Sequence, residues 1–247
     1  MFQRANGMNY VQFLRRIHES YAFEWYIEIG CRDGRILNMA QGKTIGVDPA
    51  FRLKQSILGQ KPQLHLFQET SDAFFAANRL EVLGAQPTVA FVDGMHLFEY
   101  ALRDILNIEA YADPNGVIFV HDCCPFNVDM TTRDLEALPG FWTGDVWKLI
   151  PILSKYRPDL TISVLDARPT GLLAITGLKP GAAQPQIDLF EVIDQYQDVD
   201  ITEFGLEAFA SEFEFTDAKA AFEGDSLGLS ALSRADFTTR RPTLIMP

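Results

Sequence analysis

The feature that most constrains the fold is a regular alternation of short apolar segments with segments of helical spacing. Five apolar segments are predicted to be strands: WYIEIG (25–30), TIGVD (44–48), LHLFQE (64–69), TVAFVDG (88–94) and GVIFVHD (116–122). Strands that are apolar throughout are buried on both faces. The pattern therefore predicts a parallel sheet with helices on each side.

The segments around these strands have the spacing of helices. Apolar residues recur every three or four positions in a strong amphipathic stretch at 97–112, which the sequence Asp-Pro-Asn-Gly at 113–116 should end. The other helices are expected at 9–21, 35–41, 51–58 and 71–83, the last capped by Ser71 or Asp72.

The chain changes character after the fifth strand. LTISVLDA (160–167) and GLLAITGL (171–178) are joined by a short turn, so they should pair as an antiparallel hairpin. The expected architecture is a doubly wound, Rossmann-like α/β fold with a seven-stranded mixed sheet. We divide the chain into an N-terminal helical segment (1–23), a main domain (24–180) and an acidic, mainly helical extension (181–247). The aromatic residues of the extension favour packing over disorder.

Composition limits the partners of the protein. The formal net charge of -12 argues against binding to nucleic acid or to an anionic membrane surface, which require Lys and Arg. There is no apolar core of a secretory signal, and no apolar run approaches the ~18 residues of a membrane span. Three cysteines make a poor disulfide framework. These features predict a reduced, soluble, cytosolic protein. A homodimer is left open, because aromatic residues at 2–26 and 186–215 could form an interface.

Two acids and two glycines are expected at the ends of the first two strands. Ligands of open α/β sheets bind beyond the carboxyl ends of the strands, near the point where strand order reverses. Gly30 and Gly34 would allow a tight turn to approach a ligand there. Asp48 lies twenty residues after Glu28, where an acid can bind a ribose diol. In GCRDGRI, Arg32 stands where a dinucleotide-binding loop has its middle glycine, which counts against a nicotinamide-dependent oxidoreductase.

A second group of polar residues follows the fourth and fifth strands. Asp93 and Asp122 both end apolar strands, where an acid is costly unless it is paired or bound to a ligand. His96 and His121 flank them. The plainer alternatives are that Asp93 belongs to a turn, that His96 caps a helix and that His121 is a core histidine.

Three residues farther along have open roles. Trp142, Trp147 and Lys148 could form the wall of an acceptor pocket or belong to the core. Asp145 is expected to cap a helix that begins at Val146.

The stretch YIEIGCRDG…IGVDP resembles motifs I and II of class I S-adenosylmethionine-dependent methyltransferases. In that family the glycine loop lies against the methionine part of the cofactor, and the acid after the second strand holds the ribose. The adenine usually meets residues after the third strand. The resemblance implies these cofactor-binding candidates: Glu28, Gly30, Arg32, Gly34, Asp48, Glu69, Thr70, Ser71 and Asp93. It also implies that the main domain binds S-adenosylmethionine.

The patterns D-G-x-H and G-V-I-x-x-H-D resemble a subgroup that contains small-molecule and sugar O-methyltransferases, some of them metal-dependent. The resemblance covers roughly residues 24–178 and implies methyl transfer to a hydroxyl of a small molecule or sugar. Asp93 or His96 would then be the base. Alternatively, Mg²⁺ or another divalent cation held by Asp93, His121 and Asp122 would activate the hydroxyl. Metal-dependent relatives have two adjacent acids where this chain has His121-Asp122, so the metal is left open.

Three alternatives stay open at this stage. One is the nicotinamide-dependent oxidoreductase. A second is a non-catalytic cofactor-binding module that acts through its acidic tail. A third is a different reaction on the same cofactor fold, since some relatives of the family bear hydroxylase names.

Overall fold

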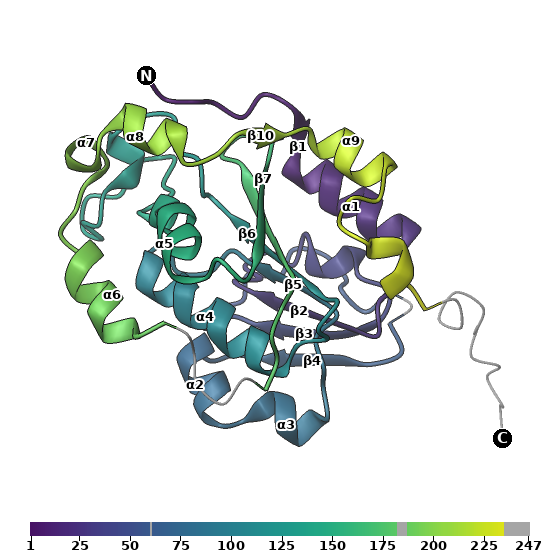
Figure 1. Ribbon diagram of the computed structural model, residues 1–247. Coiled ribbons are helices and arrows are strands. Elements are labelled where there is room, and N and C mark those ends of the chain that lie inside the picture. Colours follow the sequence, from purple (N-terminus) through teal and green to yellow (C-terminus); the bar gives the residue numbers. More distant parts are fainter. Residues whose placement is uncertain (60, 182–186, 235–247) are drawn as a thin grey trace, which may run out of the picture.

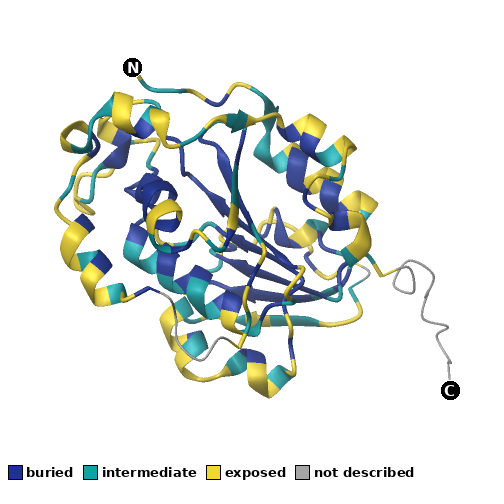
Figure 2. Cartoon of the chain, in the orientation of Figure 1, coloured by how far each residue is buried: buried dark blue, intermediate teal, exposed yellow. Residues whose placement is uncertain are grey.

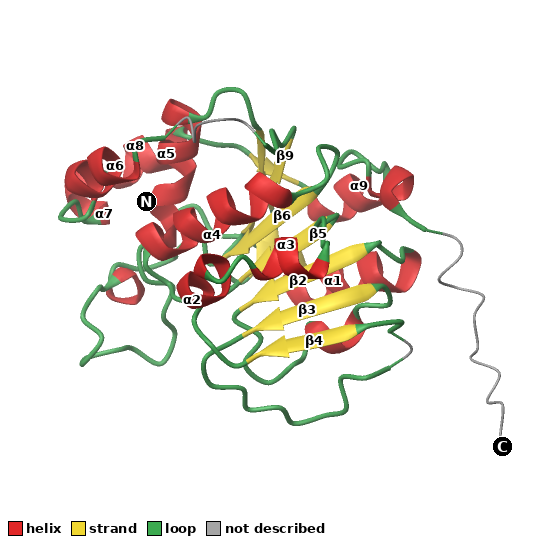
Figure 3. Ribbon diagram, turned by 90° about the horizontal axis from the view of Figure 1, so that it is seen from below, coloured by secondary structure: helices red, strands yellow, loops and turns green. Residues whose placement is uncertain are grey.

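The computed structural model describes residues 1–59, 61–181 and 187–234, and its central element is an eight-stranded sheet (Figures 1 and 3). The strand order is β10-β7-β9-β6-β5-β2-β3-β4. The strands are β2 (Trp25–Ile29), β3 (Lys43–Val47), β4 (Leu64–Phe67), β5 (Val89–Val92), β6 (Val117–His121), β7 (Thr161–Leu165), β9 (Leu172–Thr176) and β10 (Phe215–Thr216). A separate two-stranded sheet pairs β1 (Met8–Asn9) with β8 (Ala167–Arg168).

The five predicted strands pair in parallel, and β9 pairs antiparallel with both β6 and β7. The Rossmann-like fold class is thus confirmed. The sheet has eight strands where seven were expected, because β10 of the C-terminal extension adds to the edge beside β7. Strand order reverses between β2 and β5, so the expected ligand position is at the ends of these two strands.

Helices cover both faces of the sheet (Figure 1). They are α1 (Tyr10–Ser20), α2 (Ser71–Ala76), α3 (Arg79–Leu83), α4 (Phe98–Tyr111), α5 (Leu149–Tyr156), α6 (Leu189–Tyr196), α7 (Ile201–Phe204), α8 (Leu206–Ser211) and α9 (Ala218–Glu223). Short 3-10 turns occupy Leu37–Met39, Asp129–Thr131, Val146–Lys148 and Leu229–Leu232. α4 and α5 pack on one face, α1 and α9 on the other, and the strands between them are buried (Figure 2). No helix in the described ranges is long and apolar enough to span a bilayer.

Three of the expected helices differ from the structure. Residues 51–58 form no helix, because their backbone binds the glycine loop: Arg52 N donates to Arg32 O at 2.7 Å. The helix predicted at 71–83 is two helices, α2 and α3, separated at Asn78, whose left-handed φ of 50° interrupts the helical path. The helix predicted at 35–41 is only the 3-10 turn Leu37–Met39.

The described part of the extension, 187–234, packs on the rest of the molecule. Phe204 and Phe209 both contact Trp147, with ring centroids 5.3 Å apart in each pair. At its other end the extension contacts α1 and the segment that follows it: α9 packs against α1, and Ser233 Oγ accepts from Ala22 N at 3.2 Å. The extension therefore fixes the position of α1, the helix that begins with Tyr10.

Candidate functional site

A cavity of about 960 Å³ opens at the carboxyl edge of the sheet. The residues that line it follow the ends of neighbouring strands. Thr70 follows β4, Gly30 follows β2, Asp93 follows β5 and Asp122 follows β6. This is the position that the strand order predicts for a ligand. The volume lies near the top of the range of roughly 300–1,000 Å³ for sites of drug-sized ligands. The cavity therefore has enough volume to hold two small molecules at the same time.

The glycine loop after β2 lies close to the end of β5. Gly30 has a φ of +85°, and a Cβ added there would meet the backbone oxygen of Asp93 at 2.1 Å. A side chain at position 30 is therefore excluded by both conformation and space. Gly34, also at positive φ, lies against Leu53 and Ile57 and does not line the cavity.

Asp48 is held rigidly at the end of β3. Its Oδ2 accepts from Arg32 N and its Oδ1 accepts from Ala50 N, each at 2.7 Å. Both Asp48 and Arg32 line the cavity. Each carboxylate oxygen retains a further lone pair, so Asp48 can still accept hydrogen bonds from ligand hydroxyls.

Two predicted cofactor residues have structural partners instead. Glu28 is buried and accepts from Tyr26 Oη at 2.8 Å, and its burial raises its pKa well above the ordinary value. Glu69 pairs with Arg79 at 3.2 Å. Neither lines the cavity. Their assignment to the cofactor, like that of Gly34, stays a prediction.

Thr70, in the loop after β4, lines the cavity together with Ser71 and Asp72, the first two residues of α2. Thr70 also caps α2, because its Oγ1 accepts from Ala73 N at 3.2 Å. Asp72 pairs with Arg103 on α4 at 2.8 Å. The expected adenine position is thus on the cavity wall, and its side chains are fixed by contacts with α2 and α4.

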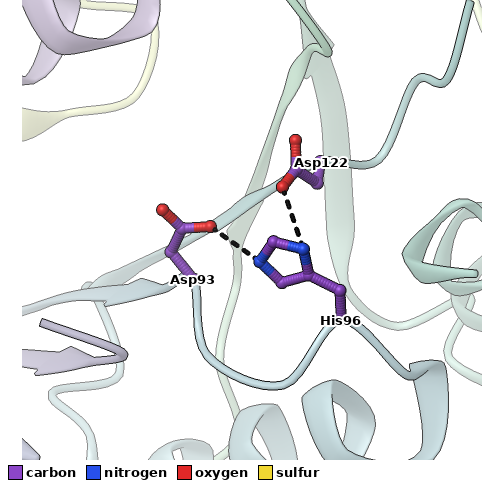
Figure 4. A group of neighbouring side chains, drawn as sticks. All are labelled: Asp93, His96 and Asp122. Atoms are coloured by element: carbon purple, nitrogen blue, oxygen red, sulfur yellow. Dashed lines mark ion pairs between the residues drawn. The ribbon is translucent and has the colours of Figure 1, made fainter. Parts of the chain in front are cut away.

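Asp93, His96 and Asp122, which we call the acid–histidine group, come together (Figure 4), and all three line the cavity. His96 Nε2 lies 3.4 Å from Asp93 Oδ1, and His96 Nδ1 lies 3.3 Å from Asp122 Oδ2. One potential ligand atom from each residue lies within 4.8 Å of the other two. The structure thus brings together three residues that the sequence analysis singled out.

His121 binds both acids and Thr170. Its Nδ1 lies 3.2 Å from Asp93 Oδ1, and its Nε2 lies 3.3 Å from Thr170 Oγ1. The Thr170 hydroxyl donates its only proton to Asp122 Oδ1 at 2.6 Å, so it accepts from Nε2. Burial alone would lower the pKa of His121, but Asp122 and Asp93 raise it well above its ordinary value. His121 therefore acts as a counter-ion for both acids.

The spacing of the donor atoms favours a set of metal ligands that contains His96, and the set with His121 stays a prediction. Both nitrogens of His121 face hydrogen-bond acceptors, which leaves no lone pair directed at a cation. Within the described residues, the group with suitable spacing contains His96 in place of His121. Three carboxylate or imidazole donors at this spacing fit a divalent cation.

Residues outside the strands orient His96. Its Nδ1 lies 2.9 Å from the carbonyl oxygen of Trp142, whose ring stacks on the imidazole with centroids 4.9 Å apart. Because a carbonyl only accepts, Nδ1 carries a proton in this contact, so in the neutral ring the lone pair is on Nε2, which faces Asp93 Oδ1. Burial lowers the pKa of His96, but its contacts with Asp93 and Asp122 outweigh this and raise it above the ordinary value. Of the open aromatic positions, Trp142 lines the cavity, whereas Trp147 is fully buried in the core.

Three residues of the site were not predicted. Tyr10 stacks on His121 with ring centroids 3.8 Å apart and lines the cavity. Thr170 binds Asp122, and Asp145 N donates to His96 O at 3.1 Å. Two of them had a local signal of another kind: Thr170 belongs to the turn of the predicted hairpin, and Asp145 was expected only as a helix cap.

Comparisons with known proteins agree with the fold. Residues 17–123 match the family model of a methyltransferase domain. No curated protein matches the chain. Cofactor-bound Rv0187 from MTB has 12% sequence identity and a TM-score of 0.50, over 68% of this chain and 78% of that one.

Two further structures are similar. An O-methyltransferase from Bacillus cereus in complex with SAH has 13% identity and a TM-score of 0.48, over 69% of this chain and 80% of its own. The O-methyltransferase TomG from Streptomyces achromogenes, in complex with SAM, has 15% identity and a TM-score of 0.48, over 70% and 80%. The family match and the fold confirm the resemblance that the sequence predicted.

Proposed function

We propose that this protein, which carries a methyltransferase domain, transfers a methyl group from S-adenosylmethionine to a hydroxyl oxygen of a small molecule. One observation carries the proposal. Asp48, positioned to bind a ribose, and the acid–histidine group, suited to removing a proton, line the same cavity. A reaction that joins a nucleoside-bearing methyl donor to a hydroxyl needs both functions within reach of each other.

In this proposal the cofactor occupies the half of the cavity beside β2, β3 and β4. The ribose hydroxyls donate to Asp48, whose two oxygens are already oriented by backbone N–H groups. The methionine part lies against Gly30 and Arg32, and the adenine lies beside Thr70. The sulfonium methyl would then point toward the acid–histidine group.

The chemistry is an in-line displacement. The bond between the methyl carbon and sulfur breaks, a bond between the methyl carbon and the acceptor oxygen forms, and the hydroxyl proton passes to a base. His96 Nε2 is the best candidate, because the Trp142 carbonyl holds the proton of the ring on Nδ1. Burial raises the pKa of Asp93, but His121 and His96 outweigh this and hold it well below its ordinary range. Asp93 therefore stays ionised and can stabilise a protonated His96.

The acid–histidine group would also hold a divalent cation, if the reaction uses one. Such a cation would act as a Lewis acid that lowers the pKa of the acceptor hydroxyl. The positions of Asp93 and Asp122 are fixed in either case by His121, the last residue of β6, and by Thr170, in the turn before β9.

Calorimetric titration with S-adenosylhomocysteine tests the cofactor assignment, and NADH tests the oxidoreductase alternative. We expect S-adenosylhomocysteine to bind with a Kd on the order of 1–100 μM and NADH not to bind. Asp48→Ala should weaken binding by about tenfold or more, since it removes charge-assisted hydrogen bonds. Asp33→Ala is the matched control, because Asp33 lies in the same loop but outside the cavity lining. Binding of NADH alone would overturn the proposal.

A further inference from the structure

The cavity has two ends of different chemical character. The end beside β3 carries the cationic residues Arg32 and Arg52. The other end, beside β6, is lined by Tyr10, Phe141, Trp142 and Pro169, which we call the acceptor end. Among the described residues that line the cavity, Lys and Arg occur only at the first end. A ligand at the acceptor end therefore meets rings, apolar surface and the acid–histidine group.

Two stacked pairs of rings lie at the acceptor end. Tyr10 stacks on His121 with an interplanar angle of 29°, and Trp142 stacks on His96 with an angle of 28°. The two aromatic rings come from segments that are far apart in the sequence: Tyr10 begins α1, and Trp142 lies in the loop before α5. Each presents aromatic surface where a ligand hydroxyl would approach the acid–histidine group. Such surfaces favour a ligand with a flat, apolar body.

The mouth of the acceptor end leaves apolar surface open to water. Phe141 is 54% exposed although it lines the cavity, and Met95 beside it in the lining is 36% exposed. Phe126, which is partly exposed, contacts Phe141 with ring centroids 5.9 Å apart. Exposed apolar side chains at the edge of a binding cavity gain from being covered by a ligand.

Resting on the proposed function, we infer that the methyl acceptor is an uncharged molecule with a flat, apolar body that carries the reacting hydroxyl. The body lies against Tyr10 and Trp142 and passes out over Phe141. An anionic acceptor would meet the carboxylates of Asp93 and Asp122, whose cationic partner His121 is already paired with both of them. Among the described residues that line the cavity, no Lys or Arg lies at the acceptor end to offset this repulsion. A small free sugar would leave the exposed apolar rim uncovered.

One cation lies outside the lining and must be included in the test. The Arg4 guanidinium is 4.4 Å from the centroid of the Phe126 ring. Arg4 is exposed, so an anionic group that left the cavity past Phe126 could pair with it. If it did, the acceptor would be an amphiphilic acid instead of an uncharged molecule.

The experiment uses two fluorescent probes that have the same N-phenylnaphthylamine body. N-phenyl-1-naphthylamine is uncharged, and 1-anilinonaphthalene-8-sulfonate carries one negative charge. Each is titrated into the full-length protein saturated with S-adenosylhomocysteine. We expect the uncharged probe to bind about tenfold more tightly. Phe141→Ser should weaken its binding about tenfold, whereas Leu135→Ser should not, although Leu135 is similarly exposed in the same loop and does not line the cavity.

The opposite results overturn the inference. Tighter binding of the sulfonate, lost on Arg4→Gln, would mean an anionic acceptor. Equal effects of Phe141→Ser and Leu135→Ser would mean that the probe binds general apolar surface and not the acceptor end. Calorimetry with S-adenosylhomocysteine on each variant keeps the two proposals apart. Retained cofactor binding with no preference for the uncharged probe contradicts this inference alone, whereas loss of cofactor binding by the wild type contradicts the proposed function.

Discussion

Asp145 caps the helix that begins at Phe98, 47 residues earlier in the chain, because its Oδ1 accepts from Phe98 N at 2.8 Å. The sequence predicted a cap at Val146, but the Asp145 side chain makes no capping bond there. Its own N–H donates to His96 O at 3.1 Å. Asp145 thus binds both sides of the turn that carries His96, and we interpret it as a positioning residue for that histidine.

Replacement of Asp145 tests this relationship. Its Oδ2 accepts from Arg133 at 2.5 Å and from the buried Lys148 at 2.8 Å, so Asp145→Ala leaves a buried cation without its partner. We expect a loss of about 3–5 kcal/mol in the free energy of unfolding. Hydrogen exchange should also become faster at the amides of residues 96–100, while the Kd for S-adenosylhomocysteine stays within twofold.

Two controls accompany this measurement. Asp145→Asn should retain the acceptor for Phe98 N, and so protect these amides better than Asp145→Ala does. Asp134→Ala changes an exposed acid of the same loop and should affect neither quantity. Unchanged exchange at 96–100 in Asp145→Ala would show that other contacts hold the turn.

Asp104 should make the stability of the protein fall as pH rises. The residue is 2% exposed on α4, its Oδ1 has no hydrogen-bond partner, and burial raises its pKa to about 7. Between the ordinary pKa and this raised value the folded state binds more protons than the unfolded state, so increasing pH destabilises the fold. The wild type should lose about 2–3 kcal/mol from pH 5 to pH 8 relative to Asp104→Asn. Urea unfolding at the two pH values measures this, and a difference between the variants that does not change with pH would contradict it.

His18 should act in the opposite direction at acidic pH. It is buried on α1 with ring centroids 4.6 Å from Tyr26, and burial lowers its pKa to about 3. The unfolded chain therefore binds a proton below about pH 6.5 that the folded protein does not. The wild type should lose about 2 kcal/mol between pH 7.5 and pH 5 relative to His18→Leu. Chemical unfolding of both proteins tests this, and parallel pH profiles would exclude His18 as the cause.

The sequence predicted the site residues that directly follow the strands of the sheet. Asp48, Asp93 and Asp122 each end an apolar strand, and parallel strands bring their carboxyl ends to one edge. Their placement on a common cavity therefore follows from strand assignment alone. The position of His96 beside the cavity could be predicted for the same reason, since it lies three residues after Asp93.

The site residues and loop conformations that the sequence did not predict depend on contacts between segments that are distant in the chain. Tyr10 contacts His121 because the residues just before it are bound to the segment at 166–168. Gly7 N donates to Asp166 Oδ1 at 2.9 Å, and Met8 pairs with Ala167. No local pattern encodes such a contact. The failed helix at 51–58 has a similar cause, since the glycine loop competes successfully for its backbone donors.

The crystal structure of the protein with S-adenosylhomocysteine tests the central claim most directly. The account predicts ribose oxygens within hydrogen-bond distance of the Asp48 carboxylate and the sulfur directed toward the acid–histidine group, with the acceptor end left open. A ligand bound with its ribose away from Asp48, or with its sulfur facing away from Asp93 and His96, would contradict it.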